Sequence, residues 1–278
     1  MKYFRRLSAK QWKTLLISAL LVCLFGVLGA VRHTQRPVAE KLPILLYHSV
    51  APAQELNPAN LYTLDVEQFK AHMKYLHDNG FQTITTEQLS DLIYRKKKLP
   101  PKSVMITFDD GIANNLEYAY PVLKEYGFHA VEYVITSYVK QEAEPFTPGK
   151  KQFMNLPRMK ECRDVFEYQS HTDNMHYYHT PGSPILLNAS EDGIRADLRK
   201  SFALPLMRKT SFAYPYGRYD TRLLRMLREL EVVQGMTTKR RYVTQDSDPL
   251  ELGRFMFRST NTFEEFKEFV DGRYVPKK

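Results

Sequence analysis

The sequence predicts an α/β protein in which about seven parallel strands form a distorted (β/α) barrel. Three observations favour this fold class. Apolar, strand-like runs alternate with helix-like stretches along the whole body of the chain. Their number suits a closed or nearly closed sheet better than an open one. Polar residues typical of catalysis follow several of these runs, and α/β barrels place their active sites at the carboxyl ends of strands.

Residues 1–41 differ in composition from the body, residues 42–278, which we expect to be one domain. Five basic residues precede the uncharged 17-residue apolar stretch 15–31. A basic flank before such a stretch is typical of a signal or membrane-anchor segment. Because Lys and Arg keep their end of the segment in the cytoplasm, the body is predicted to be extracytoplasmic, either membrane-anchored or secreted.

The charge of the chain lies mainly in this N-terminal segment. Of 40 basic and 31 acidic residues, eight and one lie in residues 1–41, which leaves 32 and 30 in the body and a net charge of +2 there. The body therefore lacks the basic surface that nucleic-acid binding requires. Cys23 lies in the apolar stretch, so Cys162 has no partner for a disulfide within the body. We expect a monomer.

The first part of the body is predicted as strand, loop, helix, strand and helix. The apolar run 42–48 ends in a histidine, and the polar, Pro-containing residues 49–63 are expected to be a loop. Asp65-Val-Glu-Gln68 has capping-box spacing and predicts a helix start, and Asn79-Gly80 predicts its end. After a short strand at 81–84, Thr86 is expected to cap a second helix that ends in the basic run 95–98.

The remaining elements alternate in the same way. We expect strands at 103–108, 130–135, 165–170, 210–214, 232–236 and 252–257. We expect helices at 115–126, 191–204, 221–230 and 263–270, with a long loop from 136 to 151. No internal repeat or low-complexity tract interrupts the series.

Two adjacent carboxylates, Asp109 and Asp110, follow the central apolar run, and Gly111 permits a sharp turn there. Two like charges at the end of a core strand raise the free energy unless something neutralises them. A metal ion would do so, with one carboxylate as a ligand and the other as a base. The alternative is that Asp-Asp-Gly is an ordinary turn.

Three histidines lie within nine residues after the strand at 165–170, namely His171, His176 and His179. Two histidines and one carboxylate form a metal site that leaves positions open for water and substrate. The spacing of five between His171 and His176 predicts a loop and not a helical face. A His-rich surface loop is the alternative, and His179 is expected to lie at the surface or behind the ligands.

Three motifs together resemble those of the polysaccharide deacetylases, carbohydrate esterase family 4 with the NodB-homology fold. They are Thr107-Phe-Asp-Asp-Gly111, His171-Thr-x-x-x-His176 and Tyr214-Pro-Tyr-Gly217. The resemblance covers roughly residues 42–260. The histidine spacing and the opening Leu-Leu-Tyr-His48 are similar to the branch that deacetylates poly-β-1,6-N-acetylglucosamine, in which the motif order is circularly permuted.

The resemblance implies hydrolysis of an N-acetyl amide by water activated at one divalent metal ion. Asp110, His171 and His176 would hold this ion, most simply Zn²⁺, with Co²⁺, Ni²⁺ or Fe²⁺ as alternatives. Asp109 would be the general base, and His48 would protonate the leaving amine. The Tyr214-Pro215-Tyr216 segment would contact substrate, and the backbone N–H of Tyr216 would hold the oxyanion.

The sequence departs from the family pattern at two places. Ala213 stands where many members have an arginine that steadies the base, and the only tryptophan, Trp12, lies far from the motifs. Arg254 or Arg258 at the end of a late strand could supply the missing cation; both could equally be surface residues. Aromatic residues are also frequent near the motifs, where they could stack on sugars or support the barrel: Tyr47, Tyr177, Tyr178, Tyr214 and Tyr216.

The leading functional hypothesis is a metal-dependent N-deacetylase of a cell-surface poly-N-acetylglucosamine in biofilm exopolysaccharide maturation. The same chemistry on peptidoglycan or chitin oligomers is the nearest alternative. A non-catalytic glycan-binding module is an alternative from another class, but a binding module needs neither a base nor an acid.

Overall fold

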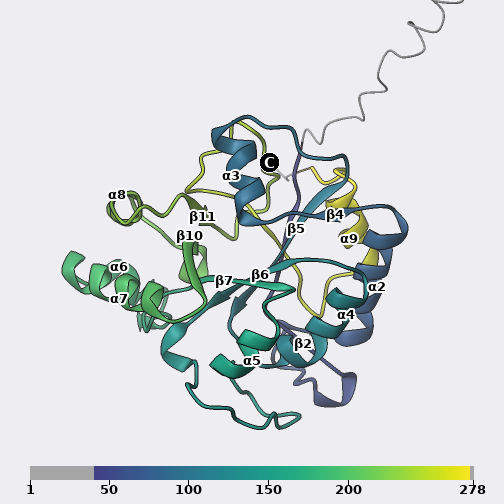
Figure 1. The fold of residues 1–278 in the computed structure, drawn as a ribbon, viewed down its shortest axis with the longest axis horizontal. Coiled ribbons are helices and arrows are strands. Elements are labelled where there is room, and N and C mark those ends of the chain that lie inside the picture. Colours follow the sequence, from purple (N-terminus) through teal and green to yellow (C-terminus); the bar gives the residue numbers. More distant parts are fainter. Residues whose placement is uncertain (1–40, 276–278) are drawn as a thin grey trace, which may run out of the picture. The chain divides into compact units, whose positions relative to one another are not determined.

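Seven parallel strands form the curled sheet at the centre of the computed structural model, which describes residues 41–275 (Figure 1). The order across the sheet is β11-β10-β7-β6-β5-β1-β12, and the short β4 (Gln82–Thr83) pairs with the start of β5. The seven strands are β1 (Ile44–Tyr47), β5 (Ser103–Asp110), β6 (Ala130–Val134), β7 (Phe166–Ser170), β10 (Met207–Ala213), β11 (Gln234–Met236) and β12 (Phe255–Met256).

The sheet curls until its two edges approach each other. β11 and β12 are not paired as strands, but Met236 at the end of β11 forms a bridge with Leu252, shortly before β12. The predicted distorted barrel of about seven parallel strands is therefore confirmed, as a half-barrel with one incomplete seam.

Helices cover the outside of the sheet in two groups (Figure 1). The helices α2 (Val66–Asp78), α4 (Tyr120–Glu125) and α9 (Phe263–Val270) bury apolar side chains against β1 and β5. The helices α7 (Glu191–Ala203) and α8 (Thr221–Glu229) pack against β10. The helix α3 (Thr86–Tyr94) packs Leu89, Leu92 and Ile93 against inward-facing strand residues such as Ile44 and Met105.

The alternation of side chains along β5 determines what reaches the site. Ile106 and Phe108 belong to the outer core under α2 and α4, whereas Met105 belongs to the inner core above α3. Because successive side chains of a strand point to opposite faces, Thr107 and Asp109 follow Met105 on the inner face. Asp109 is thereby directed into the barrel at the carboxyl end of its strand.

Several short elements were not expected from the sequence. Residues 49–63 were predicted to be a loop, but they contain β2 (Ser49–Ala51), the 3₁₀ turn Ala53–Glu55 and the first residue of β3 (Thr63–Asp65), which pairs with β2. Such short strands carry too few residues for a periodic signal. Three further short elements were also not predicted, because they too are too short for a periodic signal. They are the helix α5 (Leu156–Glu161), the hairpin of β8 (Tyr178–Thr180) with β9 (Ser183–Pro184), and the helix α6 (Ile185–Asn188).

The predicted cap at Thr86 was wrong by one residue. Thr85 is the N-cap of α3, because its side chain accepts a hydrogen bond from the Gln88 N–H and Gln88 bonds back to its backbone. The following helix prediction, 115–126, joins two elements: a π-helical turn (Asn115–Ala119) and α4.

The apolar stretch 15–31 lies outside the described residues. Among residues 41–275, no helix has both the length and the apolar character needed to cross a membrane. Cys162 is buried and carries a free thiol.

Candidate active site

Three turns with left-handed backbone conformations bring the predicted site residues together. Asp110 at the end of β5 has φ of 82°, Thr172 after β7 has φ of 77°, and Tyr216 after β10 has φ of 58°. Non-glycine residues rarely adopt this conformation, and it concentrates at functional sites where the surrounding structure holds it in place. The three turns lie at the carboxyl ends of their strands, as the barrel prediction requires.

Gly111 is required for the first turn. It has φ of 74°, and a Cβ added there would lie 2.9 Å from Val134 Cγ1. Any side chain would thus push the turn away from β6. The glycine allows the chain to turn sharply, so that the Asp110 side chain lies near His171, which follows β7.

Asp110, His171 and His176 form the metal-binding cluster that the sequence predicted. Asp110 Oδ1 lies 3.6 Å from Nε2 of His171 and 3.6 Å from Nε2 of His176. The three ligand atoms all lie within 4.8 Å of one another. This is the only cluster of this kind within the part of the chain that the structure describes.

The polar environment of the cluster fits a divalent cation. His171 Nδ1 bonds the Ala213 carbonyl at 2.8 Å, which leaves Nε2 as the free lone pair facing Asp110. Burial lowers the pKa of His171 to about 4, so its imidazole is neutral, as a ligand must be. Asp110 Oδ1 is buried without a hydrogen-bond partner among the described residues, which a bound cation would satisfy.

Asp109 and Arg254 form a buried two-bond ion pair on the other side of the turn. Arg254 Nη1 and Nη2 donate to the two Asp109 oxygens, each at 2.7 Å, and the side chain of Arg254 is 0% exposed. The Arg254 Nε donates to the Thr237 carbonyl, which fixes the plane of the guanidinium. Of the two arginines considered from the sequence, Arg254 is thus the one that contacts Asp109.

The ion pair sets the charge of Asp109. Burial alone would raise the pKa of Asp109, but the Arg254 charge and hydrogen bonds outweigh it and lower the pKa to about 2. The pair therefore stabilises the folded state above about pH 3.8, and this contribution is lost as the pH falls toward 2.

Replacing Arg254 with methionine should destabilise the protein by about 3–5 kcal/mol, because Asp109 stays buried without a partner. Chemical denaturation of Arg254→Met and of the double variant with Asp109→Asn measures this. The double variant should recover part of the loss, since the unpaired charge is gone. Arg258→Met is the matched control, because Arg258 lies over the Tyr62 ring and has no acidic partner among residues 41–275. Equal losses in Arg254→Met and Arg258→Met would contradict this account of the ion pair.

His48 follows β1 and faces the same cleft. Its ring lies 4.9 Å from the Tyr62 ring, and the charges of Asp110 and Asp109 act on it. Burial lowers the pKa of His48, and the two carboxylates oppose this effect only in part. The structure therefore brings the predicted acid, base and metal ligands to one place.

The cleft around these residues has a volume of about 660 Å³. Two of its rings are well exposed: Tyr62, 42% exposed, beside His48, and Tyr178, 46% exposed, stacked on Tyr216 at 4.0 Å. Tyr216 in turn lies 4.6 Å from the His176 ring. Tyr62 was not singled out from the sequence, because it lies in a stretch without a motif.

The structure also shows where the other residues named from the sequence lie. Tyr214, which was expected to contact substrate, is among the residues that line the cleft, while its ring packs in the core and its hydroxyl donates to the Leu250 carbonyl. Pro215 is buried as well. Tyr47 is a core residue whose hydroxyl bonds His72, and His179 is exposed on β8, as expected.

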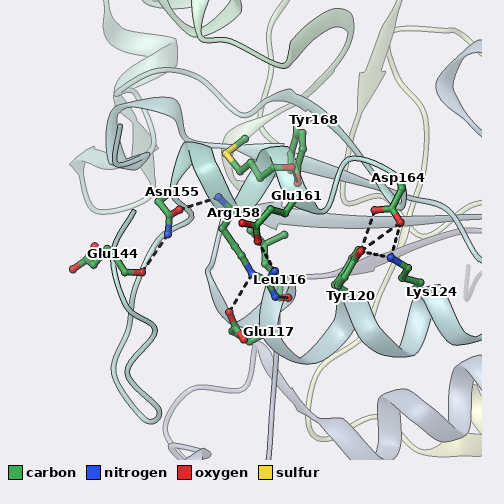
Figure 2. A network of polar contacts seen from close by, with 11 residues as sticks. Leu116, Glu117, Tyr120, Lys124, Glu144, Asn155, Arg158, Glu161, Asp164 and Tyr168 are labelled. Carbon is green, nitrogen blue, oxygen red and sulfur yellow. Dashed lines mark hydrogen bonds and ion pairs between the residues drawn. The ribbon is translucent and has the colours of Figure 1, made fainter. Parts of the chain in front are cut away.

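The segment between β6 and α5 forms one wall of the cleft through Gly149, Lys150 and Lys151. Two backbone hydrogen bonds join the end of this segment to the residues at and after the Asp-Asp-Gly turn. The Met154 N–H donates to the Gly111 carbonyl, and the Ala113 N–H donates to the Gln152 carbonyl. Figure 2 shows Arg158 of α5 bonded to the Leu116 carbonyl and to Glu117, beside Asn155, which caps the helix. The wall is thus anchored to the helical segment that follows the metal turn.

Comparison with known proteins agrees with this site. The sequence profile described as polysaccharide deacetylase matches residues 96–235. A Bacillus subtilis (strain 168) relative, provisionally named polysaccharide deacetylase YxkH, is 33% identical over 223 residues, which cover 80% of this chain and 72% of the relative. The poly-β-1,6-N-acetyl-D-glucosamine N-deacetylase of Staphylococcus aureus (strain MRSA252) is 29% identical over 250 residues, 82% of each chain.

Among solved structures, the Streptococcus pyogenes deacetylase PplD, in complex with acetate, superposes with a TM-score of 0.71 at 25% identity. The match covers 83% of this chain and 98% of that one. A half-barrel with an Asp-His-His cluster at its carboxyl end defines a hydrolase of the NodB-like class. The chain belongs to the polysaccharide deacetylase family and is a polysaccharide N-deacetylase.

Proposed function

We propose that this enzyme removes N-acetyl groups from a poly-β-1,6-N-acetylglucosamine polymer and releases acetate, in the maturation of a biofilm exopolysaccharide. The observation that carries the proposal is the position of His48, which directly follows the first strand of the sheet and lies with Asp109 and the metal-binding cluster in one cleft. Similarity to the Staphylococcus aureus poly-β-1,6-N-acetyl-D-glucosamine N-deacetylase supports the choice of polymer.

Asp110, His171 and His176 would hold the metal, and Zn²⁺ is the ion we propose. When bound, it supplies a Lewis acid that polarises the acetyl carbonyl and lowers the pKa of water beside it. Asp109 accepts the proton of the attacking water, because Arg254 keeps its carboxylate ionised and directed inward. The backbone N–H of Tyr216 is assigned to the developing oxyanion.

His48 acts last, by giving a proton to the departing nitrogen of glucosamine. An amine is a poor leaving group until it is protonated, and imidazole is the side chain suited to this transfer. Asp109 and Asp110 stabilise the charged imidazole through their negative potential, which opposes the effect of burial. The exposed rings of Tyr62 and Tyr178 are positioned to stack on sugar units beside the reacting one.

The choice of polymer is tested by acetate release from a panel of substrates. Purified protein loaded with Zn²⁺ should release acetate from poly-β-1,6-N-acetylglucosamine at least about tenfold faster than from chitin oligomers or peptidoglycan. Such a ratio needs only about 1.4 kcal/mol of discrimination in the transition state. A preference for β-1,4-linked chitin or peptidoglycan would overturn the choice of polymer while leaving the chemistry intact. Tight binding without acetate release would favour a glycan-binding module.

We also propose that the body lies outside the cytoplasm, because five basic residues precede the apolar stretch 15–31. Protease added to intact cells should then cleave the body, or the body should be found in the medium. Protection of the body until the cells are lysed would contradict this topology.

A further inference from the structure

A buried polar link connects three strands behind the active site, and the chemistry proposed above does not use it. Glu132 lies in the middle of β6, Asn115 begins the π-helical turn, and both side chains are 0% exposed. Glu132 is surrounded by apolar neighbours in its own strand, where a carboxyl group costs free energy unless it is hydrogen-bonded. An apolar residue would fill this position at lower cost.

The bonds of this link end on the backbone of the active site. Asn115 Nδ2 donates to the His48 carbonyl at 2.9 Å and to Glu132 Oε2 at 3.1 Å. Glu132 Oε1 accepts from the Gly111 N–H at 3.1 Å. The chain of bonds therefore runs from His48, through Asn115 and Glu132, to the residue after Asp110.

Strand pairing does not connect His48 to Gly111. The ladder between β1 and β5 ends at Tyr47 and Phe108, and the ladder between β5 and β6 ends at Asp110 and Val134. His48 and Gly111 both lie one residue beyond their ladders. The π-helical turn, an irregularity that is frequent at functional sites, begins with the asparagine that bridges this gap.

We propose that Asn115 and Glu132 are positioning residues that hold the His48 end of β1 at a fixed separation from the Asp109-Asp110-Gly111 turn. Proton transfer to the leaving nitrogen requires this separation to be accurate, because a misplacement of about 1 Å can cost a hundredfold in rate. The inference rests on the proposed role of His48. It assigns different tasks to the two residues, since only Glu132 contacts the metal-bearing turn.

The test measures acetate release and metal affinity for four variants. Asn115→Ala should lower kcat about 10–100-fold with little change in KM, and its affinity for Co²⁺, followed by absorption of the apo protein, should stay near that of the unmodified protein. Glu132→Ala should lower both kcat and Co²⁺ affinity, because the Gly111 N–H loses its acceptor. Glu132→Gln keeps an oxygen for that N–H and should retain about tenfold more activity than Glu132→Ala.

Glu167→Gln is the matched control. Glu167 is a buried carboxyl group on the neighbouring strand β7, but it bonds Thr86 at the start of α3, away from the cleft. This variant should change the melting temperature and leave kcat unchanged. Asn115→Leu, which fills a similar volume without a donor, replaces Asn115→Ala if the latter does not fold.

Two outcomes would overturn the inference. One is normal kcat in folded Asn115→Ala or Asn115→Leu, and the other is an equal loss of Co²⁺ affinity in the Asn115 and Glu132→Ala variants. Absence of acetate release by the unmodified protein would be a failure of the proposed function instead, and the two failures are thus distinguishable.

Discussion

Asp109→Asn should keep its metal ion and lose turnover by roughly a hundredfold or more, the usual scale of general-base catalysis. An amide cannot accept the proton of the attacking water, whereas the three ligand atoms of Asp110, His171 and His176 stay in place. Elemental analysis of the purified variant and its rate of acetate release measure the two effects separately.

Asp110→Asn is the matched comparison, since it changes the neighbouring carboxylate in the same way. We expect it to lose metal as well as activity, because a neutral amide is a much weaker ligand for a divalent cation. If both variants kept the metal ion, or both lost it equally, the assignment of Asp110 as ligand and Asp109 as base would be contradicted.

His48→Ala should retain the fold and the metal but lose most of its turnover, because the departing amine would have no proton donor. An acid must be protonated to act, so the rate of the unmodified protein should fall as the pH rises through the pKa of His48. Burial lowers this pKa from its ordinary value of 6.5, so the fall should begin at a lower pH than it would for an exposed histidine. In His48→Ala this alkaline limb should be absent.

His179→Ala is the control for the histidine substitution. His179 lies in the same His-rich segment but is exposed on β8, so its variant should show the ordinary pH profile. If His48→Ala kept near-normal acetate release with the same alkaline limb, His48 would be structural and the acid would have to be another group.

The elements that the sequence predicted well are those with a long periodic signal. The helix predicted at 263–270 matches α9 (Phe263–Val270), and the strand predicted at 130–135 differs from β6 by one residue. The half-barrel followed from their alternation. The short strands β2 and β3 could not be predicted, because their pairing depends on contacts between segments more than ten residues apart.

The active site shows the same limit. Asp110, His171 and His176 stand in motifs, so their meeting could be predicted, whereas the sequence left the partner of Asp109 open between Arg254 and Arg258. Arg254 lies well over a hundred residues from Asp109, and it reaches Asp109 because β12, which it precedes, pairs with β1, the neighbour of β5. Glu132 left a signal that was not used: a charged residue in the centre of an apolar strand needs an explanation.

The most direct measurement is acetate release from poly-β-1,6-N-acetylglucosamine by the protein before metal removal, after removal with a chelator, and after titration with Zn²⁺. The account predicts that activity disappears with the metal and returns in proportion to the metal bound, up to one ion per chain. His171→Ala should not recover under the same titration, because it lacks one of the three ligands. Acetate release at an unchanged rate by the stripped protein would contradict the account.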